Sequence, residues 1–152
     1  MIEKIMMGEK EIAFKSSAAT NILFKKTFHE DITLKLTEYS RLIEELKKLQ
    51  GDINEVKVSD IPEADKLAKI GEVMNSPAFV KSADFQSDTL PKLAYIMYLE
   101  ANEAVDNIFK KLTEEHYLIW LMTFDQEELG AHISDILMLW RKGARQMSKA
   151  KN

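Results

Sequence analysis

The sequence contains no cysteine, five glycines and three prolines among its 152 residues. Without cysteine the chain has no disulfides and no thiolate metal sites, as is common in a reducing compartment. The scarcity of glycine and proline favours helices over a turn-rich β fold.

No apolar run approaches the roughly 18 residues that a membrane span needs. The charged start MIEKIMMGEKE lacks a signal-peptide pattern. We therefore expect a mainly α-helical protein with no membrane partner.

The sequence also lacks an excess of positive charge. Its formal net charge is −4 and 30% of its residues are charged. A nucleic-acid-binding protein normally carries a basic footprint, so we expect no nucleic-acid partner. The length suits a single domain, which we place at 1–142. Cations dominate only the end of the chain, and residues 143–152 are predicted to be a basic, flexible tail.

The first part of the chain predicts a β-hairpin followed by helices. Apolar residues alternate on both sides of Gly8 within residues 2–15, which is a hairpin signal. Helices are expected over about 20–142, beginning with a short one at 20–28. A longer helix should begin after Asp31 and end at Gly51, because a helical apolar stripe lies between them. The residues of this stripe are Ile32, Leu36, Tyr39, Ile43 and Leu46.

Two connections are expected in the middle of the chain. Residues 51–65 predict a loop, with a short strand at 56–58, because they are acidic and lack a helical period. A helix with Pro62 in its first turn and Asp60 as its cap should then run to about Asn75. Pro77 and the polar SADFQSD segment predict the second connection.

The last third predicts several helices. Asp88 is expected to cap a helix that has Pro91 in its first turn, and residues 102–112 either continue that helix or restart it. Thr113 should cap the following helix. Asp125 and Glu128 have the spacing of a capping box for the last helix, which should end near 141–143.

No motif in the sequence points to catalysis or to a cofactor. None of the three histidines (His29, His116 and His132) has a glutamate three positions before it, so the di-iron pattern of helical bundles is missing. There is no glycine-rich phosphate loop and no G-x-S-x-G elbow. Glu128 and His132 lie one helical turn apart, but a lone pair is more typical of a solvated helix face. We expect no catalytic residue, no metal and no cofactor, and therefore no enzyme.

The stretch 117–140 contains both tryptophans and more apolar residues than a terminal pair of helices usually needs. Tryptophan and methionine are common at binding surfaces, although each residue taken alone is more often core. The excess predicts a protein-binding surface in this stretch. Its candidate residues are Trp120, Phe124, Leu129, Ile133, Leu137 and Trp140.

Three blocks in this order resemble the tail assembly chaperones of long-tailed bacteriophages and prophages of Gram-positive bacteria. The first block, 8–32, contains the sequences FKSSAAT and FHED after the hairpin. The second is LPKLAYIMYLEAN at 90–102, and the third is the stretch 117–140. The chain departs from the family at His29, where the family often has glycine, and the segment 51–65 matches nothing in it.

The resemblance implies a function without a cofactor. Such chaperones are thought to coat the tape measure protein, keep it soluble and recruit tail tube subunits. They act in the host bacterial cytoplasm and commonly leave the finished virion, and many also exist in a longer, frameshifted form. The role is compatible with a homo-oligomer. Two alternatives remain: a small DNA-binding regulator using residues 113–142 and the basic tail, and an interaction module unrelated to phage.

Overall fold

The computed structural model describes the backbone of residues 2–150 and all side chains in that range except those of Gln126, Ile133 and 144–150. The chain is mainly α-helical with one two-stranded antiparallel sheet at its N-terminus, as the sequence predicted. It divides into two compact units, 1–33 with 86–152, and 34–85. No sequence pattern indicated this division.

The predicted hairpin is confirmed. Strands β1 (Ile2–Met7) and β2 (Lys10–Lys15) pair in antiparallel register, with Ile5 opposite Ile12. Gly8 takes a φ of 65° in the two-residue turn, a conformation that glycine adopts at little cost. One face of the hairpin is buried, and its most buried side chains are Ile5, Met7 and Phe14.

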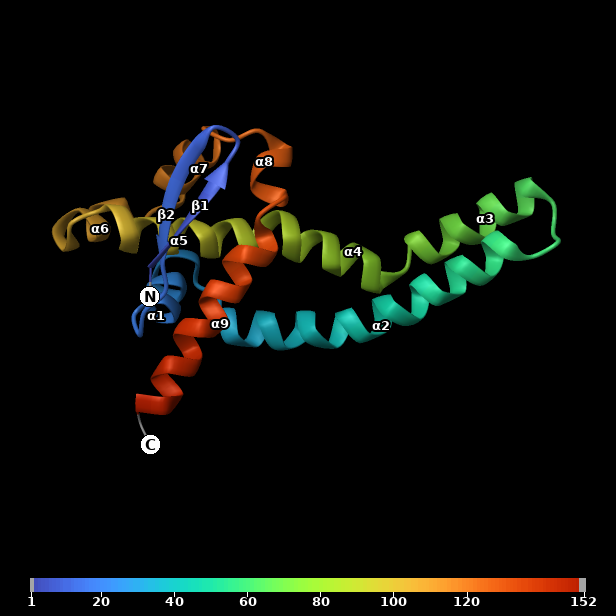
Figure 1. Ribbon diagram of the computed structural model, residues 1–152, viewed down its shortest axis with the longest axis horizontal. Helices are drawn as coiled ribbons and strands as arrows, with labels where there is room; N and C mark the ends of the chain where they lie inside the picture. The colour runs from blue at the N-terminus through green and yellow to red at the C-terminus, as the bar shows by residue number, and fades with distance from the viewer. Residues whose placement is uncertain (1, 151–152) are drawn as a thin grey trace. The chain divides into compact units, whose positions relative to one another are not determined.

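Helix α5 (Leu90–Asn102) is the centre of the first unit. Strand β2 and helices α1 (Thr20–Phe28), α6 (Val105–Lys111), α7 (Glu114–Leu121) and α9 (Ile133–Ala150) all contact it (Figure 1). Because neighbours cover α5 on several sides, it is apolar around much of its circumference. Its buried side chains are Leu90, Pro91, Leu93, Ala94, Tyr95, Ile96, Met97 and Leu99.

The caps predicted at Thr113 and at Asp125 are present. The Thr113 side chain accepts a hydrogen bond from the His116 backbone N–H at 3.1 Å and begins α7. Asp125 and Glu128 form the capping box of α8 (Gln126–Gly130). The prediction of one helix ending near 141–143 is wrong, because the chain turns after Gly130 and α9 then continues to Ala150. Its buried positions continue past Trp140 to Gly143, which explains why the helix does not stop there.

In the second unit, the prediction that a helix ends at Gly51 is wrong. Helix α2 (Ile32–Val58) passes through Gly51, so neither the predicted loop at 51 nor the strand at 56–58 exists. Apolar residues recur on both sides of the glycine at steps of three and four, and this period keeps one face of α2 against the rest of the unit. The residues of that stripe around Gly51 are Leu46, Leu49, Ile53 and Val56.

The second predicted connection is also wrong. Helix α3 (Glu63–Met74) is followed by α4 (Pro77–Asp84) and by the π-helical turn η1 (Phe85–Thr89), which leads directly into α5. The polar residues of SADFQSD are mostly exposed on this helical run, while Ser82 and Phe85 are buried. Pro62, not Asp60, occupies the N-cap position of α3, and Asp88 lies within η1, with Thr89 as the N-cap of α5.

Candidate functional site

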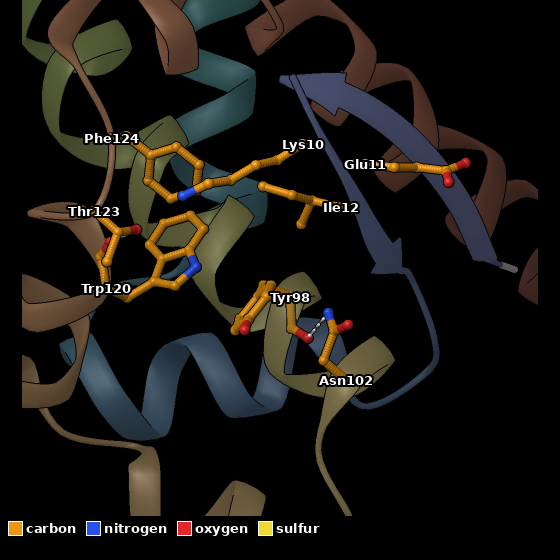
Figure 2. A pocket seen from close by; sticks show the side chains of 8 residues that line it. All are labelled: Lys10, Glu11, Ile12, Tyr98, Asn102, Trp120, Thr123 and Phe124. Carbon is orange, nitrogen blue, oxygen red and sulfur yellow. Dashed lines mark hydrogen bonds between the residues drawn. The ribbon is translucent and has the colours of Figure 1, made fainter. Parts of the chain in front are cut away.

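A pocket of about 540 Å³ lies in the first unit between β2, α5 and the end of α7. Figure 2 shows the side chains that line it. Strand β2 forms one side, the C-terminal half of α5 the second, and α7 with the turn after it the third. We call this pocket the aromatic groove. Its lining residues are Lys10, Glu11, Ile12, Tyr98, Asn102, Trp120, Thr123 and Phe124.

Trp120 is the fixed base of the aromatic groove. Its ring centroid lies 5.5 Å from that of Tyr98 and 4.8 Å from that of Phe124, and the Phe124 ring meets it edge-on at 67°. On its inner side Trp120 contacts the buried ring of Tyr95 at 5.4 Å. Trp120 is only 8% exposed, whereas Phe124 and Tyr98 are half-buried. The three rings therefore form a continuous apolar wall that a partner side chain can contact.

The opposite side of the aromatic groove is the outer edge of β2. Residues flanking a two-residue hairpin turn form a hydrogen-bonded pair, and such pairs alternate along the strands. With Met7 opposite Lys10, the N–H and C=O groups of Glu11 and Ala13 point away from β1. The hydrogen bond from Asn102 Nδ2 to Ala13 O, 2.8 Å long, agrees with this geometry.

Glu11 borders the aromatic groove through its backbone. Its side chain points away from the groove in Figure 2, while the side chains of Lys10 and Ile12 extend from β2 toward it. Asn102 also donates to Tyr98 O at 2.9 Å, which holds its amide at the rim. The groove therefore combines an apolar wall, one cation and a strand edge, which is the combination that binds an extended peptide.

Two buried tyrosine rings, those of Tyr95 and Tyr117, lie behind Trp120 with their centroids 5.6 Å apart. Burial raises the pKa of Tyr95 to about 12, helped by the nearby Glu103 carboxylate. Its hydroxyl donates to Lys111 O at 2.6 Å. Burial also raises the pKa of Tyr117, with a smaller contribution from Asp88. Both phenols are thus neutral across the physiological pH range.

The structure brings together two of the six residues predicted for the partner surface, Trp120 and Phe124. Leu129 is buried elsewhere, and the Ile133 side chain lies outside the described residues. Leu137 and Trp140 are half-buried on α9. Trp140 Nε1 donates to Asn21 Oδ1 at 2.8 Å, so this tryptophan attaches α9 to α1.

The sequence did not predict that Lys10, Ile12 and Tyr98 belong to the same site, because no local pattern joins the hairpin to α5 and α7. It also missed which residues of α7 and its C-cap are exposed. Leu118, Ile119 and Met122 are 53%, 64% and 83% exposed. A signal was available, since the run YLIWLM is apolar at every position and a helix cannot bury all of its faces against one neighbour.

The three histidines are not part of clusters of acidic residues in the described part of the chain. His132 Nδ1 lies 3.1 Å from Asp135 Oδ2, one turn along α9, rather than against Glu128. Among the described side chains, no group of three or more histidine, aspartate or glutamate residues is placed to hold a metal ion. Within the described part of the chain, no helix is both long and apolar enough to span a membrane.

Comparison with protein-family models, curated proteins and solved structures finds no match to this chain.

Proposed function

We propose that the protein is a tail assembly chaperone that binds apolar segments of a tape measure protein in the aromatic groove and keeps that protein soluble. The resemblance of three ordered blocks suggests the role. The observation that carries the proposal is the groove itself, where the Trp120 and Phe124 rings face the open edge of β2.

The chemistry of the groove suits this kind of client. A tape measure protein is a long chain with apolar side chains exposed until the tail closes around it. One such side chain resting on Trp120 removes apolar area from water, and the backbone groups of Glu11 can accept an adjacent extended segment. Single contacts of this size are weak, but many copies on one long client gain from multivalency.

The wider role follows from the proposed binding. A chaperone bound along the tape measure protein would also present it to tail tube subunits in the cytoplasm of the host bacterium, and would leave before the virion is complete. A tape measure gene directly downstream of this gene would support the proposal.

The test is co-expression with the tape measure protein encoded beside this gene. We expect the wild-type chain to keep the tape measure protein in the supernatant after centrifugation and to co-purify with it. Replacing Phe124 by alanine should weaken binding about thirtyfold or more, because an aromatic anchor at an interface contributes about 2 kcal/mol or more. Circular dichroism should remain unchanged.

Phe79→Ala is the matched control, since Phe79 is also a half-buried phenylalanine but lies in α4, outside the groove. It should leave solubilisation intact. The proposal is wrong if the wild-type chain leaves the tape measure protein in the pellet. It is also wrong if folded Phe124→Ala and Phe79→Ala variants solubilise it equally well.

A further inference from the structure

Helix α7 and its C-cap residue Met122 present an outward face of acids and apolar side chains, with the exposed His116 at one edge. At 100° per residue, five exposed residues occupy one continuous arc of the helix, while Tyr117 and Trp120 lie on the buried side. Its apolar members are exposed to between 53% for Leu118 and 83% for Met122. We call this surface the acidic face. Its residues are Glu114, Glu115, Leu118, Ile119 and Met122.

A second surface, on α1 and α6, combines apolar side chains with cations. The outward side of α1 forms a shallow hollow of about 450 Å³ lined by Ile22, Lys25, Lys26 and His29. Lys26 Nζ lies 4.9 Å from the centroid of the Phe109 ring, which joins the hollow to the exposed side of α6. We call this surface the basic face. Its residues are Ile22, Lys25, Lys26, His29, Val105 and Phe109.

The apolar members of the basic face are also uncovered. Ile22, Val105 and Phe109 are 69%, 68% and 54% exposed. Among the described residues, no carboxylate forms an ion pair with Lys25 or Lys26. On α6, Asp106 offsets Lys110, and Lys111 pairs with Glu103, so most of the unpaired positive charge comes from α1. This local excess contrasts with the net charge of −4 for the whole chain.

The two faces complement each other in charge, apolar content and size. Each presents two adjacent charged residues of one sign beside three exposed apolar side chains. The α7 helix has eight residues and α1 has nine, so each is roughly 12–14 Å long. Apolar patches of this kind, rimmed by charge, typically mark protein-binding surfaces. Opposite charges on them favour encounter in one orientation.

From this complementarity we infer that the partner of each face is a second copy of this chain, with the acidic face of one copy bound to the basic face of the next. Such a contact is heterologous: both copies retain one open face after pairing. Association therefore continues head to tail, into a ring if the rotation closes and into a filament if it does not. Neither face contains a residue of the aromatic groove, so the inference does not rest on the proposed function.

The test uses charge reversal on each face. We expect the mass of the wild-type chain, measured by size-exclusion chromatography with light scattering, to rise with concentration and to fall with added salt. Lys25→Glu with Lys26→Glu, and separately Glu114→Lys with Glu115→Lys, should each weaken association at least tenfold. A mixture of the two double variants should associate again, because each supplies the face that the other has lost and the reversed faces also complement each other.

Helix α2 offers matched controls. Lys47 and Lys48 are adjacent exposed lysines, and Glu44 and Glu45 are adjacent exposed glutamates. Reversing either pair changes the net charge by the same amount and should leave association at the wild-type level. The inference is overturned if the wild-type chain remains a monomer at all concentrations and low salt. It is equally overturned if the α1 or α7 variants behave like the α2 controls, or if the mixture stays monomeric.

The test of head-to-tail association can fail or succeed independently of the test of the aromatic groove. The reversed variants keep Trp120, Phe124 and the β2 edge, so a monomeric variant that still co-purifies with the tape measure protein retains the groove. If Phe124→Ala no longer co-purifies with the tape measure protein but still associates with itself, only the aromatic groove has been affected.

Discussion

Gly143 of α9 lies directly against Ser16, the residue that follows β2. A β-carbon added at Gly143 would stand 2.8 Å from the Ser16 Cβ, which is closer than real β-carbons approach one another. Both residues are buried. Within the turn that ends at Gly143, Lys142 pairs with Glu3 at 3.0 Å and Trp140 donates to Asn21. Helix α9 is therefore attached to the hairpin and to α1 at this one turn.

We expect Gly143→Ala to destabilise the protein by about 1–3 kcal/mol, because a buried methyl group without space forces side chains or backbone to move. Alanine normally stabilises a helix relative to glycine by about 1 kcal/mol, so the steric cost must outweigh that gain. The measurement is the free energy of unfolding from urea denaturation followed by circular dichroism.

Gly51→Ala in α2 is the matched control. A β-carbon at Gly51 would meet no atom within 4 Å, and the glycine lies inside a helix. We expect stabilisation of about 1 kcal/mol from helix propensity alone. If both substitutions stabilise the protein, α9 does not pack on Ser16 as described.

Gly51 also shows where sequence patterns stop predicting this fold. The hairpin could be predicted because Gly8 and the alternation around it are local signals that the strands obey. At Gly51 the local signal for a helix end competed with the apolar period that continues from Leu49 to Ile53. Packing along the length of α2 contributes more than the roughly 1 kcal/mol that one glycine costs, so the helix continues.

The sequence predicted only part of the aromatic groove, and the reason differs from the one at Gly51. The sequence identified the apolar excess around Trp120 and Phe124, but burial is decided by neighbours distant in sequence. Tyr98 of α5 and Lys10 of β2 complete the aromatic groove, and no spacing within 117–140 could indicate them. The same neighbours cover Trp120 and leave Met122 in solvent.

Trp120→Ala should therefore destabilise the fold, whereas Met122→Ala should not. Truncating a tryptophan that contacts Tyr95, Tyr98 and Phe124 leaves a large cavity and should cost about 3–5 kcal/mol. A substitution at the exposed Met122 should change stability by less than about 0.5 kcal/mol. Denaturation midpoints of the two variants test this directly. Equal midpoints would show that Trp120 is not part of the core.

Glu100 predicts a dependence of stability on pH. Burial raises the pKa of this carboxyl group, and hydrogen bonds from the Ser17 and Thr20 hydroxyls only partly oppose the shift. The folded chain therefore binds a proton at Glu100 more tightly than the unfolded chain does. The resulting stabilisation is fully present below the unfolded pKa of about 4.3 and is lost as pH rises through the raised folded pKa.

Glu100→Gln keeps the shape of the side chain and removes its titration. Relative to wild type, this variant should gain stability as pH rises from about 4.3 through the folded pKa, and the difference should then stay constant. Ser17→Ala should move the window to higher pH, because it removes a hydrogen bond that favours the charged form. Urea denaturation at a series of pH values measures both effects. If the difference in the free energy of unfolding between wild type and Glu100→Gln does not change with pH, the pKa of Glu100 is not raised in the folded chain.

His29 ends α1 in a left-handed conformation, with φ of 59° and ψ of 28°. Its N–H donates to Lys25 O at 2.8 Å, which completes the helix end. A side chain in this region costs about 1–2 kcal/mol relative to glycine, and glycine is the usual residue at such an end. We expect His29→Gly to stabilise the protein by about 1 kcal/mol, since greater freedom of the unfolded chain offsets part of the gain. His29→Ala, which keeps a β-carbon, should give no such gain.

Thermal unfolding at low protein concentration measures both variants, because contacts between copies do not contribute there. The assignment of the left-handed conformation to His29 is wrong if alanine stabilises the protein as much as glycine does.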